Sequence, residues 1–442
     1  MQFKEYPSYK ASGVEWLGDV PNHWNLKRFG YIFDENKKKN IGLKEINVLS
    51  LSYGNIKEKN IDDNKGLLPE SFETYQIIKP NDIVFRFTDL QNDKRSLRSA
   101  ISKYHGIITS AYISVTTKQN ADFYNYLFRA YDLQKVFYSM GEGMRQSLKM
   151  DELNKMPVVL PNKDEQKHIV SFLDTETARI NNLISKQEKL IELLEEQRKS
   201  IISHAVTKGL NPNAPMKDSG VEWLGNVPEH WELTPIKHLV KTQKGFAFSS
   251  HLFKEDDNGI GITKASDIKN GSILEASTFI DKDQFDEYKK YQLYTDDIII
   301  STVGSTPEVS NSAVGQIGLL PEDLEGCLLN QNTVIFRSKP LIDQVFLYYT
   351  LLSKAYRNYL DLFAHGTANQ ASLSIVDMLA FSLPLPPKNE QSDIVLYIKK
   401  KSFVINRLIH NQKQLIEKLK EYRSSIISHA VTGKIDVREL ST

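Results

Sequence analysis

The chain has 442 residues and a mass of 50.6 kDa, about two to three times the usual size of one domain, so we expect at least two domains. Its 56 Lys and Arg residues nearly balance 55 Asp and Glu residues, which excludes nucleic-acid binding through bulk positive charge. The single cysteine, Cys327, excludes a disulfide framework and a multi-cysteine zinc site, and it favours a reducing, cytoplasmic location. Neither a signal-peptide pattern nor a long apolar run occurs, so we expect no export and no membrane span.

The chain is an internal duplication. The segment SGVEWLGDVPNHW at 12–24 recurs at 219–231 as SGVEWLGNVPEHW. Further on, LPNKDEQKHIV from Leu160 matches LPPKNEQSDIV from Leu385, and SIISHAVT at 200–207 recurs at 425–432. Between these repeats, residues 30–140 and 237–364 share little identity, so a constant frame surrounds two variable interiors.

Each copy closes with a long predicted helix. Asp164 and Asn389 are the expected N-caps, and Gly209 and Gly433 stand where a helix end favours a positive φ. Apolar residues recur along one narrow seam at heptad-like spacing, which predicts that the two helices pair as a coiled coil. The seam residues are Leu173, Ile180, Ile184, Gln187, Ile191, Leu194 and Ile201 in the first helix, and Ile398, Ile405, Ile409, Gln412, Ile416, Leu419 and Ile426 in the second.

The mid-helix glutamines Gln187 and Gln412 have two open interpretations. They are either solvated edge positions or a polar layer that fixes the register of the helix pair. We expect the pair to run antiparallel, with the tail after Thr432 returning toward Met1 much as the short linker 208–218 joins the two halves.

The variable interiors have a mixed pattern. Turns lead into β-branched strands at 77–86 and 291–300, another strand is expected at 327–336, and helical periodicity covers 122–138 and 342–362. The expected fold is α+β, with two mixed α/β domains joined by a long antiparallel two-helix coiled coil in a pseudo-two-fold internal repeat. We divide the chain into a first variable domain at 1–160, a helix at 161–207, a linker at 208–218, a second variable domain at 219–386, a helix at 387–432 and a tail at 433–442.

The doubled GVEWLG…P…HW segment, the doubled LP…EQ…IV helix start, and the loops GEGMRQSL at 141–148 and GTANQASL at 366–373 carry a family resemblance. Over essentially its full length the chain resembles the DNA specificity subunit of type I restriction-modification systems, the HsdS family. The resemblance implies a non-catalytic subunit in which each variable domain is a target recognition domain for one half of a bipartite sequence in double-stranded DNA. It also implies that the helices set the spacer and dock two methyltransferase subunits, that restriction subunits with motor and nuclease activity can join, and that S-adenosylmethionine and ATP/Mg belong to those partners.

In the first domain, residues 86–98 combine basic side chains with amides. Arginine can pair bidentately with guanine, Asn or Gln can pair with adenine, and lysine suits phosphates. A DNA-contact loop and an exposed loop whose charges pair with Asp89 and Asp93 are both open interpretations. The candidate DNA-binding residues here are Arg86, Gln91, Asn92, Lys94, Arg95 and Arg98, with Arg145 from a later loop.

In the second domain the DNA-binding candidates are polar residues on turns or strand ends, where a purely structural role is also open. They are Lys264, Ser301, Thr302, Asn330, Gln331, Asn332, Asn369 and Gln370. The net charge is +4 for residues 1–160, −1 for 161–207, −7 for 208–386 and +5 for 387–442. The acidic second domain favours the alternative function, a coiled-coil adaptor that binds proteins without direct DNA readout.

No pattern in the sequence indicates catalysis. A phosphate-binding loop, a His-Glu-x-x-His motif and a methyltransferase tetrapeptide are all missing. Glu165-Gln-Lys167 resembles a nuclease motif, but its counterpart Glu390-Gln-Ser392 lacks the lysine, which favours a helix-start role for both. We therefore predict no catalytic residue and no metal site. The tryptophans occur identically in both copies, which favours a core role over base stacking.

Overall fold

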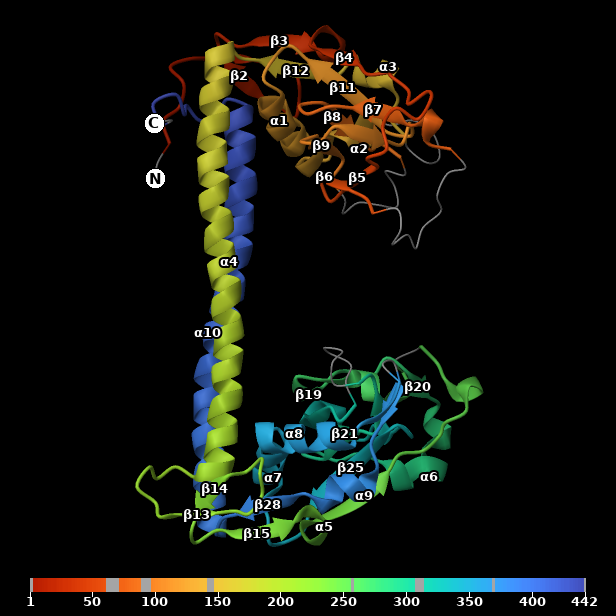
Figure 1. Cartoon of the computed structure of the whole chain (residues 1–442), viewed down its shortest axis with the longest axis vertical. Helices are drawn as coiled ribbons and strands as arrows, with labels where there is room; N and C mark the ends of the chain where they lie inside the picture. The colour runs from red at the N-terminus through yellow and green to blue at the C-terminus, as the bar shows by residue number, and fades with distance from the viewer. Residues whose placement is uncertain are drawn as a thin grey trace. The chain divides into compact units, whose positions relative to one another are not determined.

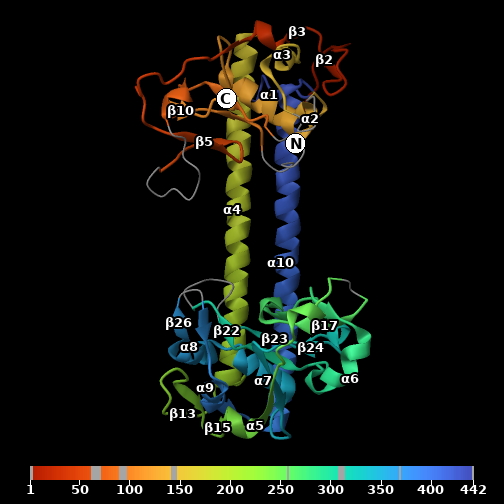
Figure 2. The same ribbon diagram turned by 90° about the vertical axis from the view of Figure 1, so that its right-hand side faces the viewer.

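The computed structural model describes residues 3–60, 71–88, 97–140, 147–255, 258–306, 314–367 and 370–440. The chain divides into two compact units, one of Met1–Glu188 with Lys413–Thr442 and one of Lys189–Gln412. Each unit contains one strand-rich module and part of both long helices, α4 (Lys163–Lys208) and α10 (Lys388–Val431) (Figure 1, Figure 2). We call the strand-rich part before α4 the first module and the one before α10 the second module.

The first module is built around an antiparallel four-stranded sheet in the order β4-β11-β8-β9. Strand β8 consists of Ile83, Val84 and Phe85, all buried, and follows a turn in which Asn81 has a φ of 73°. Helix α1 packs its aromatic face on the sheet, with the rings of Phe85 and Phe128 5.0 Å apart. The elements are β1 Tyr9–Ala11, β2 Asp19–Pro21, β3 Asn25–Arg28, β4 Phe33–Glu35, β5 Leu49–Ser52, β6 Asn55–Glu58, β7 Gln76–Ile78, β8 Ile83–Phe85, β9 Ser99–Ile101, β10 Gly106–Ile108, β11 Ile113–Thr117, α1 Ala121–Leu133, α2 Val136–Met140, α3 Met150–Leu153 and β12 Pro157–Leu160.

The second module is built around a six-stranded sheet in the order β16-β25-β21-β23-β19-β18, in which only β19 and β23 pair in parallel. Ile298 and Ile300 of β21 pack in the core cluster that includes Phe346 of α7, whereas Ile299 packs with Leu293 on the other side. Because both faces of β21 are buried, its sequence is a continuous apolar run. The elements are β13 Met216–Asp218, β14 Asn226–Pro228, β15 Glu232–Pro235, α5 Ile236–Leu239, β16 Val240–Lys244, β17 Ile260–Thr263, β18 Ile268–Lys269, β19 Gly271–Ile273, β20 Phe279–Ile280, α6 Phe285–Tyr288, β21 Ile298–Ser301, β22 Val303–Gly304, β23 Ile317–Leu319, β24 Leu328–Leu329, β25 Thr333–Ser338, α7 Gln344–Leu351, α8 Lys354–Phe363, β26 His365–Thr367, β27 Gln370–Ser372, α9 Ile375–Ala380 and β28 Ser382–Leu385.

Each predicted single helix inside a module is in fact two helices. The pattern at 122–138 is interrupted between α1 and α2, where Lys135 has a φ of 61°. The pattern at 342–362 is interrupted between α7 and α8, where the Ser353 side chain accepts a hydrogen bond from the Tyr356 amide and caps α8. Apolar periodicity continues through both breaks, so it could not reveal them.

The two long helices span Lys163–Lys208 in α4, 46 residues, and Lys388–Val431 in α10, 44 residues. The predicted N-caps are wrong: Asp164 and Asn389 lie inside the first turns. The Asn162 side chain instead accepts a hydrogen bond from the Glu165 amide at 2.9 Å. Gly209 and Gly433 follow the helix ends, and both have a φ of 75°, as a helix C-terminus favours.

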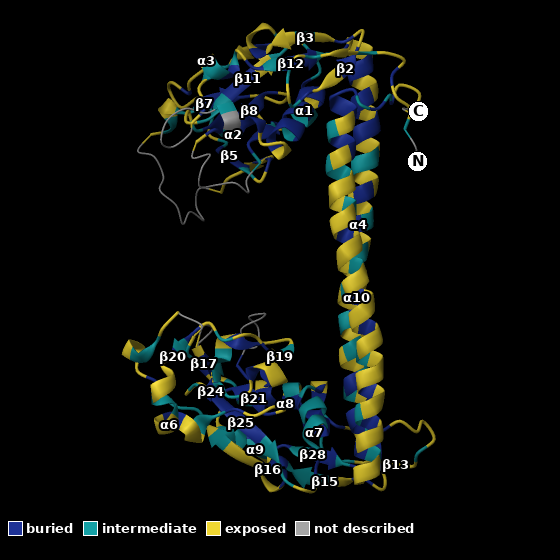
Figure 3. Cartoon of the chain, turned by 180° about the vertical axis from the view of Figure 1, so that it is seen from behind, coloured by how far each residue is buried: buried dark blue, intermediate teal, exposed yellow. Residues whose placement is uncertain are grey.

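Within each unit, α4 and α10 run antiparallel. In the second unit Leu194 packs with Ile405 and Ile409, and Arg198 Nη1 donates to Asn406 Oδ1 at 2.8 Å. In each unit the start of one long helix also lies near the end of the other, because one tryptophan contacts both. Figure 3 shows buried positions on the facing sides of the helices and exposed positions elsewhere.

The predicted seam residues are all buried or half-buried. The buried ones are Leu173, Ile180, Ile184, Leu194, Ile398, Ile405, Ile409, Ile416 and Ile426, and the half-buried ones are Gln187, Ile191, Ile201, Gln412 and Leu419. The Oε1 atom of Gln412 is buried and has no hydrogen-bond partner among the described residues. A register-setting role for the two glutamines stays a prediction.

Candidate nucleic-acid interface

Both modules are fixed to a long helix by the same anchor. In the first unit the Trp24 indole N–H donates to Glu165 Oε1 at 2.9 Å, and His23 Nε2 lies 3.0 Å from Glu165 Oε2. In the second unit the indole N–H of Trp231 donates to Glu390 Oε2 at 3.1 Å, with the His230 ring nitrogen 2.8 Å from the same oxygen. Both indole rings are fully buried. Trp24 and Trp231 are therefore core residues, and the glutamates that resembled a nuclease motif hold them in place.

The glutamine after each anchor glutamate orients the module's main helix. Gln166 Oε1 accepts a hydrogen bond from the Asn120 amide at 3.0 Å, and the Asn120 side chain caps α1. In the other unit Gln391 Oε1 accepts one from the Asp343 amide at 2.7 Å, and the Asp343 side chain caps α7. Both glutamines are fully buried. The Glu-Gln pair thus ties each module to the start of a long helix at two points.

The glycine after each long helix packs against the tryptophan of the other anchor. A Cβ added at Gly209 would lie 3.2 Å from the Trp231 ring, and one added at Gly433 would lie 3.1 Å from the Trp24 ring. Each tryptophan therefore contacts the start of one long helix and the end of the other. A larger residue would be tightly packed at Gly209, and at Gly433 its Cβ would overlap the Pro21 ring.

A lysine near each helix end completes the anchor. Lys208 Nζ donates to the Leu224 carbonyl at 3.0 Å and Lys434 Nζ to the Leu17 carbonyl at 2.8 Å. Burial lowers the pKa of both amino groups. The two lysines stand on opposite sides of their glycines in the sequence, so the same contact is made from different positions.

The C-terminal tail docks on the first residues of the chain, as we predicted for the segment after Thr432. Lys4 and Asp436 form an antiparallel bridge, and Lys4 Nζ lies 2.8 Å from Glu439 Oε2. The Arg438 guanidinium stacks 5.0 Å from the Tyr6 ring and hydrogen-bonds Asp436, which lowers the pKa of that carboxyl. The first unit is thereby closed from both ends of the chain.

The structure does not favour Arg98 as a DNA contact in the first module. Its side chain is fully buried, where Nη1 donates to the Thr88 carbonyl at 3.2 Å and Nε to the Tyr138 hydroxyl at 3.3 Å. A guanidinium held this way cannot reach a duplex without giving up those bonds. Arg86 is half-buried, and its amide donates to the Arg98 carbonyl. The candidates Gln91, Asn92, Lys94, Arg95 and Arg145 lie outside the described residues.

In the second module, two of the predicted DNA contacts are buried. Ser301 is 2% exposed and its hydroxyl accepts a hydrogen bond from the Gln316 amide, while Thr302 is 7% exposed. Because both side chains are buried within the fold, the structure does not favour them as DNA contacts. Asn330 is half-buried in a turn that places Gln331 and Asn332 in solvent.

The remaining candidates of the second module differ in exposure. The half-buried Lys264 places its amino group 5.0 Å from the Phe253 ring centre and bonds the Thr278 hydroxyl. Gln370 is exposed at the start of β27. Asn369 lies outside the described residues.

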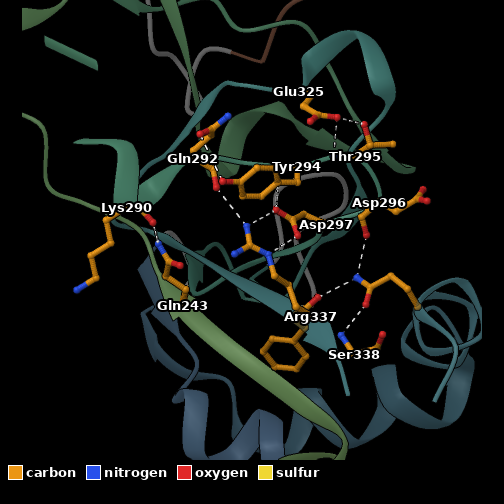
Figure 4. Close-up of polar contacts among 12 residues, drawn as sticks. Gln243, Lys290, Gln292, Tyr294, Thr295, Asp296, Asp297, Glu325, Arg337 and Ser338 are labelled. Atoms are coloured by element: carbon orange, nitrogen blue, oxygen red, sulfur yellow. Dashed lines mark hydrogen bonds and ion pairs between the residues drawn. The ribbon is translucent and has the colours of Figure 1, made fainter. Parts of the chain in front are cut away.

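Several carboxylates of the acidic second module are used internally. Asp297 accepts both the Nε and Nη2 hydrogens of Arg337 at 2.6 Å, and the Tyr294 ring lies 5.0 Å from that guanidinium (Figure 4). Hydrogen bonding to Asp297 raises the pKa of Arg337, so the guanidinium stays charged. Asp267 accepts the Lys264 amide, and Asp343 caps α7. Part of the module's negative charge is therefore satisfied within the fold.

Each module also carries a tight hairpin that our sequence analysis missed. In the first module β5 and β6 are joined by Tyr53 and Gly54, with φ of 47° and 71°. In the second, β18 and β19 are joined by Asn270 and Gly271, with φ of 51° and 83°. Two consecutive positive φ values are typical of the type I′ turn. Tyr53 is 74% exposed, and Asn270 is also exposed.

The main helix of each module holds the carbonyl of its hairpin glycine. Arg129 of α1 donates from Nη2 to the Gly54 carbonyl at 2.9 Å, and the Tyr348 hydroxyl of α7 donates to the Gly271 carbonyl at 2.6 Å. Different side chains thus make the same contact in two modules with different sheets. Each hairpin tip is positioned through α1 or α7 by the anchor on the long helix.

Comparisons with known proteins agree on one family. The sequence pattern of the type I restriction modification DNA specificity domain matches residues 97–193 and 228–420. The type I restriction enzyme MjaVIII specificity subunit of Methanocaldococcus jannaschii is 29% identical over 343 residues, 76% of each chain. The EcoBI specificity subunit of Escherichia coli is 24% identical, over 62% of this chain and 58% of that protein.

A solved structure supports the same fold. It is described as the structural basis underlying complex assembly and conformational transition of the type I restriction-modification system. It superposes with a TM-score of 0.67 at 15% identity, covering 94% of this chain and 99% of that one.

The chain therefore belongs to the type I restriction-modification DNA specificity family. Members of this family are specificity subunits, which are non-catalytic, so family membership confirms our prediction that the chain is not itself an enzyme. The described residues include no cluster of three or more His, Cys, Asp or Glu side chains suited to a metal ion. None of the helices in the described parts of the chain is long and apolar enough to cross a membrane.

Proposed function

We propose that the chain selects DNA for a type I restriction-modification complex, with each module reading one half of a bipartite target. The observation that carries this proposal is one anchor used twice, by Trp24 with Glu165 and by Trp231 with Glu390, to hold two modules with different sheets. A repeated frame with unlike interiors suits two unlike half-sites, whereas identical modules would suit a palindrome. The division into recognition domains at 1–160 and 219–386 is part of this proposal.

The hairpin tips and the neighbouring polar turns are the proposed base-reading elements. Asn270 and Asn332 offer exposed amides in the second module, and Asn or Gln can pair bidentately with adenine. Exposed Tyr53 and half-buried Arg86 offer a ring and a guanidinium in the first module. Because the net charge of the second module is negative, we expect neutral donors to carry more of its readout than phosphate contacts do.

The long helices are the proposed spacer and docking elements. They would set the distance between half-sites and bind two methyltransferase subunits, and restriction subunits can join that complex. S-adenosylmethionine would be bound by the methyltransferase partner and ATP with Mg²⁺ by the restriction partner. A cytoplasmic location is part of the same proposal, because host DNA lies there.

Mapping of modified bases tests this function. The chain and its methyltransferase partner are expressed in a host that lacks other DNA methyltransferases, and methylated positions are read by single-molecule sequencing. We expect one bipartite motif with two unlike halves and a fixed spacer. Methylation that is the same without the chain, or a continuous or palindromic motif, would contradict the proposal.

A protein adaptor is the competing function, favoured only by the acidic second module. An adaptor would leave the affinity of the methyltransferase for duplex DNA unchanged. A specificity subunit is expected to confer binding that weakens steeply with salt, because phosphate contacts release counterions.

A further inference from the structure

The first half of α10 exposes an apolar face that no other part of the described chain covers. Leu396 is 67% exposed, Phe403 70%, Val404 50% and Leu408 41%. Their spacing of seven, eight and twelve residues places them on one side of a helix. The seam toward α4 is formed by other residues, among them the buried Ile405 and Ile409. The helix is thus apolar on two faces, one that packs on α4 and one that is exposed.

The corresponding face of α4 is less apolar. The repeated helix start places each α4 residue 225 positions before its α10 counterpart, and the seam residues match at that offset. The counterparts of Leu396, Phe403 and Val404 are Ser171, Ala178 and Arg179, whereas that of Leu408 is again a leucine, Leu183. Arg179 forms an ion pair with Glu176 at 2.7 Å. The frame is conserved between the two copies, but this face is not.

Charge differs between the two faces as well. Lys400 and Arg407 lie on the same side of α10 as Leu396 and Phe403, and both are exposed. Their counterparts on α4 are the neutral Thr175 and Asn182. The flanking Lys399 and Lys401 correspond to the acidic Asp174 and Glu176. The charge at these two positions is therefore positive on α10 and negative on α4. The α10 face therefore suits an apolar surface edged by carboxylates.

These charges also exclude one occupant of the α10 face. A second copy of the chain bound through a two-fold axis would bring the same patch against itself, with Lys400 and Arg407 opposite like charges. An amphipathic, acidic helix of another protein meets both the apolar and the cationic groups. Exposed apolar surfaces of this kind usually bind the apolar face of an amphipathic helix from the partner.

We propose that the two methyltransferase docking faces are unequal. The α10 face, formed by Leu396, Lys400, Phe403, Val404 and Arg407, binds the first subunit tightly through an acidic amphipathic helix. The less apolar α4 face binds the second subunit more weakly. The complex then assembles in two steps, and the subunit serving the second module is bound first. This inference rests on the proposed function, since it takes the methyltransferase subunit as the partner.

The test transplants one face onto the other in the full-length chain. The chain is titrated with its methyltransferase subunit, and the 1:1 and 2:1 complexes are measured by native mass spectrometry. We expect the wild type to bind its first subunit at least tenfold more tightly than its second. In the triple variant Leu396→Ser, Phe403→Ala, Val404→Arg, the unchanged α4 face is expected to bind the first subunit, because exposed apolar anchors dominate such interfaces. The first affinity then falls at least tenfold, to about the affinity of the second step of the wild type.

The reciprocal variant is the matched control. Ser171→Leu, Ala178→Phe and Arg179→Val are expected to strengthen the second binding step by tenfold or more. All six positions lie on helix surfaces away from the seam, and circular dichroism checks that helix content is retained. Equal affinities in the wild type, unchanged binding of the triple variant, or self-association of the wild type that the triple variant abolishes would each overturn the inference.

The outcomes also separate this inference from the proposed function. Two subunits that bind equally leave the proposed function intact and overturn the inequality. A chain that binds no methyltransferase subunit in either form overturns the proposed function itself.

Discussion

Exchanging residues 30–140 for the same segment of another family member is expected to change one half of the DNA target and leave the other half intact. The exchanged segment lies between Trp24 and Glu165, so the anchor of the first module stays in place. Each wrong base pair costs a specific complex about 1–3 kcal/mol, so loss of several contacts abolishes recognition of the old half-site. Methylation mapping of the chimera with its methyltransferase partner measures this directly.

The reciprocal exchange of residues 237–364 is the matched control. It is expected to change the other half-site alone, because Trp231 and Glu390 again remain outside the exchanged segment. Exchanging only the hairpin tips tests whether Tyr53 and Asn270 by themselves determine which bases are read. A chimera in which both half-sites change would show that the modules do not read DNA independently.

Trp231→Ala is expected to destabilise the second unit by about 3–5 kcal/mol, the usual cost of removing a buried large aromatic side chain. The ring is fully buried against Gly209, and the indole N–H satisfies Glu390. The variant leaves a cavity and deprives a carboxylate of a partner at the same point. Unfolding in guanidinium chloride measures the loss of stability, and native-state hydrogen exchange shows which of the two units has lost it.

Trp24→Ala in the first unit is the twin of this change, and it is expected to destabilise that unit instead. Trp231→Phe keeps most of the ring but not the N–H, so we expect a smaller loss, about 1.5–3 kcal/mol for a hydrogen bond to a charged group. Unfolding of Trp231→Ala at the wild-type midpoint would rule out the anchor as the main support of the module.

The long helices and the repeat were predictable because their signals are local. Heptad-like spacing depends on residues a few positions apart, and it correctly placed Leu194, Ile405 and Ile409 in a packed seam. The predicted N-cap of α4 was two residues too late, because both Asn162 and Asp164 can accept a capping hydrogen bond and only the backbone path selects Asn162. The role of the Glu-Gln pair required the fold, since its partners lie far away in the sequence.

The DNA candidates were less predictable because exposure depends on distant residues. Arg98 stood in a basic, polar segment, yet Tyr138 and Thr88 bury and bond it. The hairpin at Asn270 and Gly271 carried the usual Asn-Gly turn signal and could have been found. Its counterpart at Tyr53 could not, because tyrosine seldom adopts a positive φ.

Lengthening both long helices tests most directly whether they set the separation of two unlike readers. One heptad is duplicated in each helix, residues 184–190 in α4 and 409–415 in α10, which keeps the seam continuous. Seven residues add about 10 Å of helix at 1.5 Å per residue, which corresponds to about three base pairs. Methylation mapping is expected to show the same two half-sites with a spacer longer by two to three base pairs. An unchanged spacer in an active, folded variant would contradict the account.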